Sequence, residues 1–383
     1  MQHFYFDHNA TTPVAPEVLE TMVSCLGQVY GNASSIHYFG QAAKQKLEAA
    51  RRQVAALIHA SPTEVVFTSG GTEADNLAVL GTVRPAGRPS HLIISAIEHP
   101  AVLAAAAQLE REGVSVTRLP VSADGTVDPE DVRRALRPET VLVSIMHANN
   151  ELGMVQPIAE ISRIAHEAGV LVHSDGVQAL GKIAVDVNAL GVDLYSMSGH
   201  KLYAPKGVGA LYVRKGTKLA PVAFGGHHER DRRPGTENVP CIVALGAACE
   251  LAGRRIAEES ERLASLRDRL ESSVLGRIPG TGVNGGLANR TPNTTNIYFD
   301  SVDGEAMVIA LDLRGFAVST GSACSSGAIT PSHVLTALGL SADRARSSLR
   351  FSLGRSTTVE QVDALVDALE SSVAHLRRIS VHA

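Results

Sequence analysis

Short apolar runs rich in valine and isoleucine recur along this chain and alternate with segments of helical periodicity. The runs lie at residues 65–67, 91–94, 141–145 and 170–173, and a helical segment precedes them at residues 41–58. Such alternation is typical of βαβ units, in which parallel strands are covered by helices on both faces. The pattern therefore predicts an α/β fold built on a largely parallel sheet.

The last third of the chain follows a different pattern. Residues 254–275 are rich in arginine, glutamate and leucine, which predicts a long amphipathic helix with exposed charges. Two further strand candidates lie at residues 295–299 and 348–352. Because 383 residues exceed the usual length of one domain, we expect two. They are a large domain of residues 15–252 and a smaller α+β domain of residues 1–14 and 253–383.

Composition and charge exclude several classes of function. The 35 basic residues are outnumbered by 39 acidic ones, tryptophan is absent, and no basic run forms a stripe that suits nucleic acid. No segment approaches the roughly 18 uninterrupted apolar residues of a membrane span, and the amino terminus lacks a signal-peptide pattern. We therefore expect a cytoplasmic protein that binds small molecules or proteins, but neither nucleic acid nor membrane.

The four cysteines, at positions 25, 241, 249 and 324, show no CxxC spacing, which argues against a structural zinc site and a disulfide framework. Cys25, Cys241 and Cys249 lie among apolar residues, as core cysteines do. Cys324 lies in a run of serine, glycine and alanine, residues 319–327, which is typical of an exposed loop. Its thiol is therefore available to ionise and act as a nucleophile.

Polar groups follow the predicted strands, at the sheet edge where parallel sheets bind ligands. After the first strand, the backbone N–H of Gly71 and the hydroxyl of Thr72 open a helix and can face a phosphate. Asp175, which ends the fourth, can keep a pyridine nitrogen protonated and so make the ring an electron sink. His99 can stack on a flat ring or move a proton, and the Asn150 amide can hydrogen-bond a cofactor hydroxyl and a substrate carboxylate.

Lys201 completes this set. It follows Ser198, Gly199 and His200 and precedes a glycine-rich run, as a lysine that forms a Schiff base does. An ordinary lysine is protonated at neutral pH, so one that condenses with an aldehyde needs a partly desolvated pocket. Singly, these residues have simpler roles, such as a solvated lysine or a helix cap. Together they are the groups that a phosphorylated, aldehyde-bearing pyridine requires, which is pyridoxal 5'-phosphate.

Two further segments carry polar groups of interest. Arg350 lies among apolar neighbours in a predicted strand, where its guanidinium suits bidentate capture of an α-carboxylate, and a structural ion pair is the alternative. Residues 227–229, His-His-Glu, do not have the spacing of metal ligands, because adjacent residues do not converge on one ion. We expect a loop there and no metal.

These motifs resemble the cysteine desulfurases of the NifS/IscS type, which are class V, fold-type I pyridoxal-phosphate enzymes. The resemblance spans nearly the whole chain, and its further motifs lie at residues 7–13, 31–35, 225–230 and 234–238. It implies a large domain with a mostly parallel seven-stranded sheet and a smaller α+β domain. The long loop around Cys324 resembles the group that includes NifS and IscS, not the SufS-like group.

The resemblance also implies roles around the cofactor ring and the substrate. Lys201 would bind the cofactor covalently, His99 would stack on the ring and help to move protons, and Asp175 would pair with the ring nitrogen. Gln178 would meet the ring hydroxyl. The substrate side of the site is formed by a separate set, in which Asn150 and Arg350 would hold the carboxylate of cysteine and Asn32 would lie nearby.

The phosphate contacts implied by the resemblance come from two copies of the chain. Within one copy they are Gly71, Thr72, Ser198 and His200. In the family, the threonine that corresponds to Thr236 reaches the phosphate of the other subunit, which implies an obligate homodimer with two composite sites.

The implied reaction takes sulfur from L-cysteine. Lys201 would take the α-proton, the Cys324 thiolate would attack the substrate sulfur, and the products would be L-alanine and a persulfide on Cys324. The sulfur would pass to an iron–sulfur scaffold or a tRNA-thiolation protein. No permanent metal is implied, because the other cysteine ligands of a cluster are missing nearby. Cys324 would only transiently contact a cluster on such a partner.

Two departures from the family pattern and two alternatives accompany this interpretation. Gly176 stands where alanine is usual and could loosen the placement of Asp175, and Ser325 stands where threonine is common. One alternative is a selenocysteine lyase or related class V aminotransferase, which would need no Cys324. The other is a non-catalytic sulfur-assembly subunit, against which the presence of Lys201, His99 and Arg350 argues.

Overall fold

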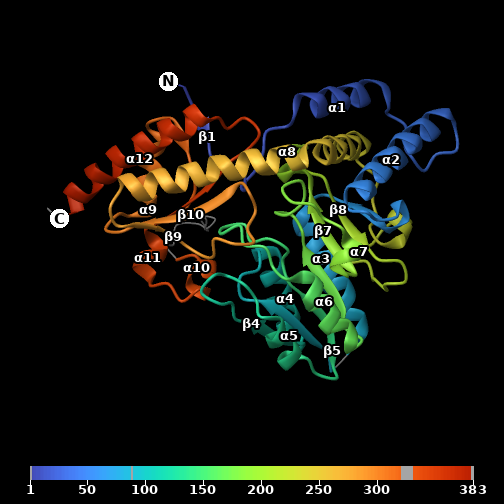
Figure 1. The fold of residues 1–383 in the computed structure, drawn as a ribbon. Helices are drawn as coiled ribbons and strands as arrows, with labels where there is room; N and C mark the ends of the chain where they lie inside the picture. The colour runs from blue at the N-terminus through green and yellow to red at the C-terminus, as the bar shows by residue number, and fades with distance from the viewer. Residues whose placement is uncertain (1, 88, 321–330, 381–383) are drawn as a thin grey trace.

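A computed structural model describes residues 2–87, 89–320 and 331–380. Cys324 and Ser325 lie outside the described residues. Within them, two groups of elements surround separate cores, and the 39-residue helix α8 (Val239–Arg277) runs past both (Figure 1). Both termini lie at the same end of the molecule, beside the smaller group of strands (Figure 1).

The larger group contains a seven-stranded sheet in the order β2-β8-β7-β6-β5-β3-β4. Only β8 runs antiparallel to its neighbours, so the predicted mostly parallel α/β sheet is confirmed. The strands are β2 (Val65–Thr68), β3 (His91–Ser95), β4 (Ser115–Leu119), β5 (Thr140–Ser144), β6 (Leu171–Asp175), β7 (Leu194–Ser198) and β8 (Gly209–Val213).

Helices cover both faces of this sheet, which explains why its strands read as continuous apolar runs. In β2, Val66 packs into the cluster that holds α3 (Gly71–Val83) and α4 (Pro100–Arg111), whereas Val65 and Phe67 face the other cluster. That second face is covered by the first part of α8 and by α1 (Pro16–Gln28), α2 (Tyr38–Leu57), α5 (Pro129–Ala135), α6 (Ile158–Glu167) and α7 (Val187–Leu190).

The smaller group has an antiparallel sheet in the order β12-β10-β9 and a parallel pair, β1 with β11. Its core cluster joins the amino-terminal Phe6 to the second part of α8 and to the last third of the chain. The elements are β1 (Phe4–Tyr5), β9 (Thr281–Val283), β10 (Thr294–Phe299), β11 (Phe316–Ala317), β12 (Ser348–Ser352), α9 (Gly304–Asp312), α10 (His333–Ala337), α11 (Ala342–Arg346) and α12 (Val359–Ser380).

Helix α8 begins 15 residues before the helix expected at residues 254–275. The early part was missed because it is buried on most sides, so no polar face marks a helical period. Its residues join the core of the larger group up to Ala252 and that of the smaller group from Leu263 onward. This change of partners supports a domain boundary between residues 252 and 253, which stays our proposal.

Two expectations about particular segments can also be checked. Cys25, Cys241 and Cys249 are buried, which confirms their core placement. Among the described residues, no helix is both long and apolar enough to cross a membrane.

Candidate active site

The site lies where the parallel strands end. Asp175 is the last residue of β6, His99 caps α4 just after β3, and Gly71 opens α3 after β2. Lys201 ends a single 3₁₀ turn, η3 (Gly199–Lys201), that follows β7. Because these strands run in the same direction, their carboxyl ends bring the side chains to one edge of the sheet.

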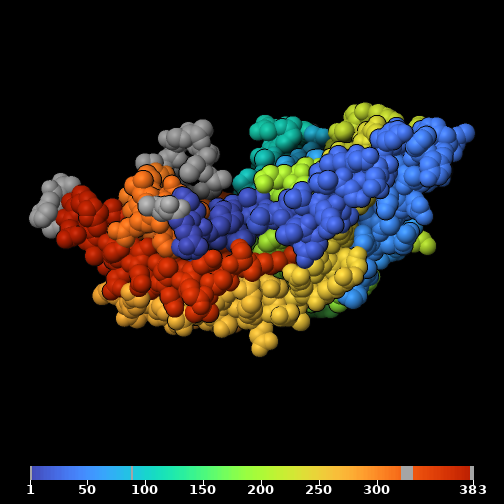
Figure 2. All heavy atoms as spheres, turned by 90° about the horizontal axis from the view of Figure 1, so that it is seen from above, coloured from blue at the N-terminus to red at the C-terminus, as the bar shows by residue number. Residues whose placement is uncertain are grey.

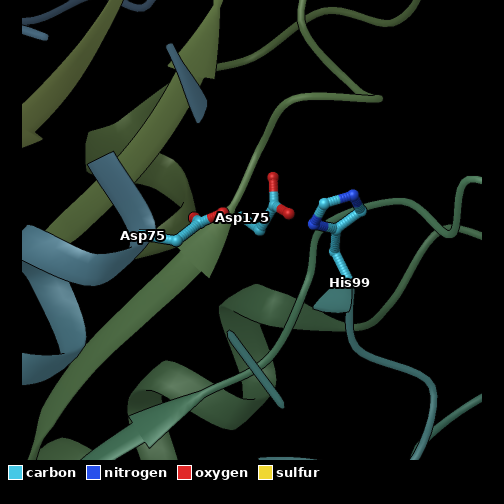
Figure 3. A group of neighbouring side chains, drawn as sticks. All are labelled: Asp75, His99 and Asp175. Atoms are coloured by element: carbon cyan, nitrogen blue, oxygen red, sulfur yellow. The ribbon is translucent and has the colours of Figure 1, made fainter. Parts of the chain in front are cut away.

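Figure 3 shows the centre of this edge, where the His99 ring points toward the Asp175 carboxylate and Asp75 approaches from α3. One polar atom from each of the three lies within 4.8 Å of the others. His99 Nδ1 accepts a hydrogen bond from the Ala101 N–H at 3.1 Å, so a neutral ring carries its proton on Nε2. Burial lowers the pKa of His99, with Asp175 opposing and Lys201 adding to the shift.

Asp175 is a buried carboxyl group that forms no ion pair with another described residue. Its Oδ1 accepts from the Val177 N–H at 2.9 Å, and burial raises its pKa, opposed by His99 and Lys201. A protonated pyridine nitrogen placed here would supply the charge that keeps Asp175 ionised. The chemistry of the site therefore fits pyridoxal 5'-phosphate, because an amine, a carboxylate and an anion-binding helix start lie at one edge.

The Lys201 amine loses its proton more readily than an ordinary lysine amine. Its Nζ donates to two backbone carbonyls, Asn9 at 2.5 Å and Ala10 at 2.6 Å. Burial lowers the pKa of Lys201 to about 8, helped by Arg350 and opposed by Asp7 and Asp175. At neutral pH roughly a tenth of the amine is then unprotonated and nucleophilic, against less than ~0.1% for an ordinary lysine.

Three of the predicted phosphate residues, Gly71, Thr72 and Ser198, meet at the start of α3. A side chain on Gly71 would come within 2.8 Å of Val177 Cγ2 and 3.4 Å of Ser198 Cβ, so the loop after β2 lies directly against the end of β7. Thr72 is exposed beside it, with the helix N–H groups available to an anion. His200 Nδ1 lies 3.2 Å from Thr11 Oγ1, and burial lowers its pKa to about 4, so the ring is neutral.

Arg350 is buried in β12 and makes the ion pair that was its alternative role. One guanidinium nitrogen donates to Asp7 Oδ1 at 2.6 Å and another to the Asn150 carbonyl at 3.0 Å. Its Nε is buried and has no hydrogen-bond partner among the residues that the structure describes. The structure thus joins Arg350 and Asn150, as a shared role requires, and leaves the Nε–H among the guanidinium donors open to a further acceptor. Capture of a substrate carboxylate by these two residues stays a prediction.

Asn32 and Thr236 lie away from this centre in the chain's own fold. Asn32 is exposed between α1 and α2, where its Oδ1 accepts from the Ser34 N–H at 2.9 Å. Thr236 is exposed ahead of α8. Residues 227–229 do not form a metal site either, since Glu229 is buried and pairs with Arg51 at 2.7 Å.

Comparison with known proteins places this geometry in a family. The family model for class-V aminotransferases matches residues 4–365. The IscS cysteine desulfurase of Dictyoglomus turgidum is 48% identical over 98% of the chain and 96% of its own length. The chain belongs to the cysteine desulfurases of the class-V aminotransferases. Enzymes of this family depend on pyridoxal phosphate.

Solved structures agree with this assignment. A NifS-like protein superposes with a TM-score of 0.92 at 36% identity, covering 98% of this chain and 100% of its own. A structure described as SspA in complex with cysteine has a TM-score of 0.82 and 38% identity, covering 91% and 98%. The expected fold-type I architecture of the desulfurases is therefore confirmed.

Three residues of the desulfurase site carry contacts that the sequence did not reveal, namely Asn9, Asp75 and Lys182. Asn9 belongs to the family motif at residues 7–13, but nothing in that motif shows its side-chain contacts. Lys182 follows Gln178 by four residues, a spacing that places side chains together on a helical turn and was the available signal. Asp75 sits among the first residues of α3, where an acidic residue would ordinarily be exposed.

Asp75 is a fully buried acid behind Asp175. Burial raises its pKa well above the ordinary value, and Asp175 adds to the shift. His173 Nε2 lies 3.6 Å away, but burial lowers the pKa of His173 to about 3, so this ring supplies no positive charge. Two carboxyl groups this close cannot both ionise cheaply. Asp75 therefore holds its proton and leaves the negative charge on Asp175.

The structure gives a steric reason for glycine at position 176. A side chain there would come within 1.9 Å of the Tyr195 ring, which fills the space that alanine would need. The Tyr195 hydroxyl lies 2.9 Å from His147 Nδ1, so the ring is fixed at both ends. Gly176 is thus required by its neighbour Tyr195.

We predict that Gly176→Ala, which introduces the usual family residue, destabilises the protein by about 1–3 kcal/mol through overpacking. Tyr195→Leu should relieve this clash while costing stability on its own. In urea unfolding of the two single variants and the double variant, we expect the double variant to be less destabilised than the sum of the single effects. Additive effects would contradict a direct Gly176–Tyr195 conflict.

We predict that Asp75→Asn removes a pH-dependent loss of stability. When the pKa of an acid is higher in the folded than in the unfolded state, the free energy of unfolding falls as the pH rises above the pKa of the unfolded state. For Asp75 the unfolded-state pKa is 3.8. In thermal unfolding of the apoprotein, the variant should therefore gain on the wild type between pH 5 and pH 8. Parallel melting-temperature curves would show that Asp75 is not the neutral acid.

Proposed function

We propose that this chain is a cysteine desulfurase that removes sulfur from L-cysteine and gives L-alanine and a persulfide on Cys324. The observation that carries the proposal is the Lys201 amine, which lies beside Asp175 and His99 with its pKa lowered to about 8. A binding module or a scaffold subunit has no need of such an amine. The curated relative named IscS and the cysteine complex of SspA support cysteine as the substrate.

Different residues would bind the cofactor, transfer the substrate proton and orient the substrate. Asp175 would hold the cofactor ring nitrogen, Gln178 the ring hydroxyl, and the start of α3 the phosphate. When bound, the cofactor supplies an electron sink for the bond changes at the substrate. Lys201 would take and return the substrate proton, because its lowered pKa suits proton transfer near neutral pH. Arg350 and Asn150 would orient the carboxylate.

Both flanks of the segment that contains Cys324 are tied to the site. Before it, Ser319 exchanges backbone hydrogen bonds with Arg350 at 2.6 and 3.3 Å. After it, Ser332 Oγ donates to Glu151 Oε2 at 2.6 Å, and His333 Nε2 lies 3.0 Å from the Glu98 carbonyl. These anchors support a role for Cys324 within reach of bound substrate. The acceptor of its sulfur would be an iron–sulfur scaffold or a tRNA-thiolation protein, and we expect a cytoplasmic location.

An exposed apolar surface on α1, α2 and their connection supports the proposed homodimer. On α1, Leu19, Val23 and Leu26 are each about half exposed, and beyond it Ile36 is 95% and Tyr38 80% exposed. The helices form one end of the molecule, shown in blue in Figure 2. A monomer seldom exposes so many large apolar side chains together. A second copy would cover them, and the exposure of Thr236 is compatible with its reaching a partner's phosphate.

We predict that purified wild type forms alanine and sulfide from L-cysteine with a reductant, and that Lys201→Ala lowers the rate by about 10²–10⁴-fold or more. Cys324→Ser should lose sulfide formation while retaining the visible absorbance of bound cofactor. That absorbance is the control for an intact site. Full turnover by Cys324→Ser would instead favour a lyase that needs no thiol.

We predict a dimer for the wild type in light scattering after size-exclusion chromatography. Ile36→Asp with Tyr38→Asp should yield monomers, because burying two unpaired charges in an interface costs several kcal/mol. Leu287→Asp, a matched change at a residue 66% exposed in the loop before β10, is the control and should leave the dimer intact. A monomeric wild type would contradict the composite site.

A further inference from the structure

A second lysine lies next to the residues that support Lys201. Lys182 Nζ donates to Asn9 Oδ1 at 2.8 Å and also to Gln178 Oε1. Both acceptors are neutral amides. Burial lowers the pKa of Lys182 well below its ordinary value, with further contributions from Lys201 and Arg350. Desolvating an amine among other cations costs free energy of folding, which points to a role for Lys182 beyond solubility.

The hydrogen bond from Lys182 to Gln178 holds the orientation of the Gln178 amide. The Asn9 carbonyl can only accept, so the Gln178 atom that faces it must be the amide nitrogen, and the amide oxygen faces the Lys182 donor. The amide nitrogen is then turned the other way, where it donates to the Asn9 carbonyl at 3.0 Å and keeps a second N–H for another acceptor. Gln178 can therefore only donate toward the cofactor side.

The hydrogen bond from Lys182 to Asn9 holds the Asn9 side chain. Its side-chain oxygen accepts from Lys182 and from Asn293 Nδ2, the latter at 3.1 Å, and its nitrogen donates to the Asn150 carbonyl and to Thr294 Oγ1. All four hydrogen-bonding positions of this buried amide are thus used. The Asn9 backbone carbonyl is the group that accepts from Lys201.

A small cavity of about 30 Å³ adjoins both lysines, with His8 and Tyr203 among its lining residues. Lys182 is a donor to both Gln178 Oε1 and Asn9 Oδ1. Its loss would leave two buried amide oxygens poorly satisfied.

We propose that Lys182 is a positioning residue of the desulfurase site, which fixes the Gln178 amide so that its N–H faces the cofactor's ring hydroxyl and fixes Asn9 beneath Lys201. The proposal rests on the proposed function, because Gln178 is taken to meet that hydroxyl. An N–H donor there favours the ionised oxygen over the protonated one. Lys182 thereby sets which ionisation state of the bound cofactor prevails at neutral pH.

The test compares Lys182→Met, which keeps the length and removes the donors, with wild-type holoenzyme. The first readout is the pH midpoint of the visible absorbance of bound cofactor, and the second is the Kd for pyridoxal phosphate added to apoprotein. We expect the midpoint to move by about one pH unit, equivalent to a tenfold change in equilibrium, and the Kd to rise about tenfold. Lys218→Met, at an exposed residue after β8, should change neither.

A double-variant comparison separates positioning from general damage. If Lys182 acts through Gln178, then Lys182→Met should add little to the midpoint shift caused by Gln178→Met. Lys182→Arg, which keeps donors, should lie closer to wild type. A midpoint and Kd unchanged in Lys182→Met, or shifts that add fully in the double variant, would overturn the proposal. Failure of wild type to bind the cofactor would instead overturn the proposed function, since neither readout needs sulfur chemistry.

Discussion

The four hydrogen bonds of the Asn9 side chain hold together the parts of the site that come from distant sequence. They join the amino-terminal segment to Asn150 in the segment after β5, to Lys182, and to Asn293 and Thr294 at the start of β10 in the smaller group. Because the same residue's carbonyl receives Lys201, the position of the reactive amine depends on all of these elements at once. The site can form only when both groups of strands and the first ten residues are in place.

Charge is separated across this site in a way that matches the cofactor. On one side, Asp75, Asp175 and Glu98 are buried acids whose pKa values are raised by burial, and the proximity of Asp175 adds to the shift of the other two. On the other side, Lys182 and Lys201 are partly buried amines with lowered pKa values. Each set is destabilised by its own desolvation, and a protonated ring nitrogen beside Asp175 would stabilise the ionised form of that acid.

The sequence predicted the features that depend on local pattern and strand direction. The parallel sheet followed from the apolar runs, and the meeting of His99 and Asp175 followed from the shared edge of the strands. What it missed depends on contacts between segments far apart, as with Asn9 and Lys182, or on burial that removes a helical period, as at the start of α8. The Cys324 segment lies outside the described residues, so its role rests on the sequence and the family.

The contact between Gly176 and Tyr195 has a consequence for how such sequences can diverge. An alanine at position 176 is compatible with the fold only after the ring at position 195 has become smaller, since the two would occupy the same space. The order of substitution is therefore constrained: replacing the tyrosine first opens room, whereas replacing the glycine first passes through a less stable protein. Substitutions at these two positions, 19 residues apart, therefore depend on each other. A chain with the large ring at position 195 cannot readily accept alanine at position 176.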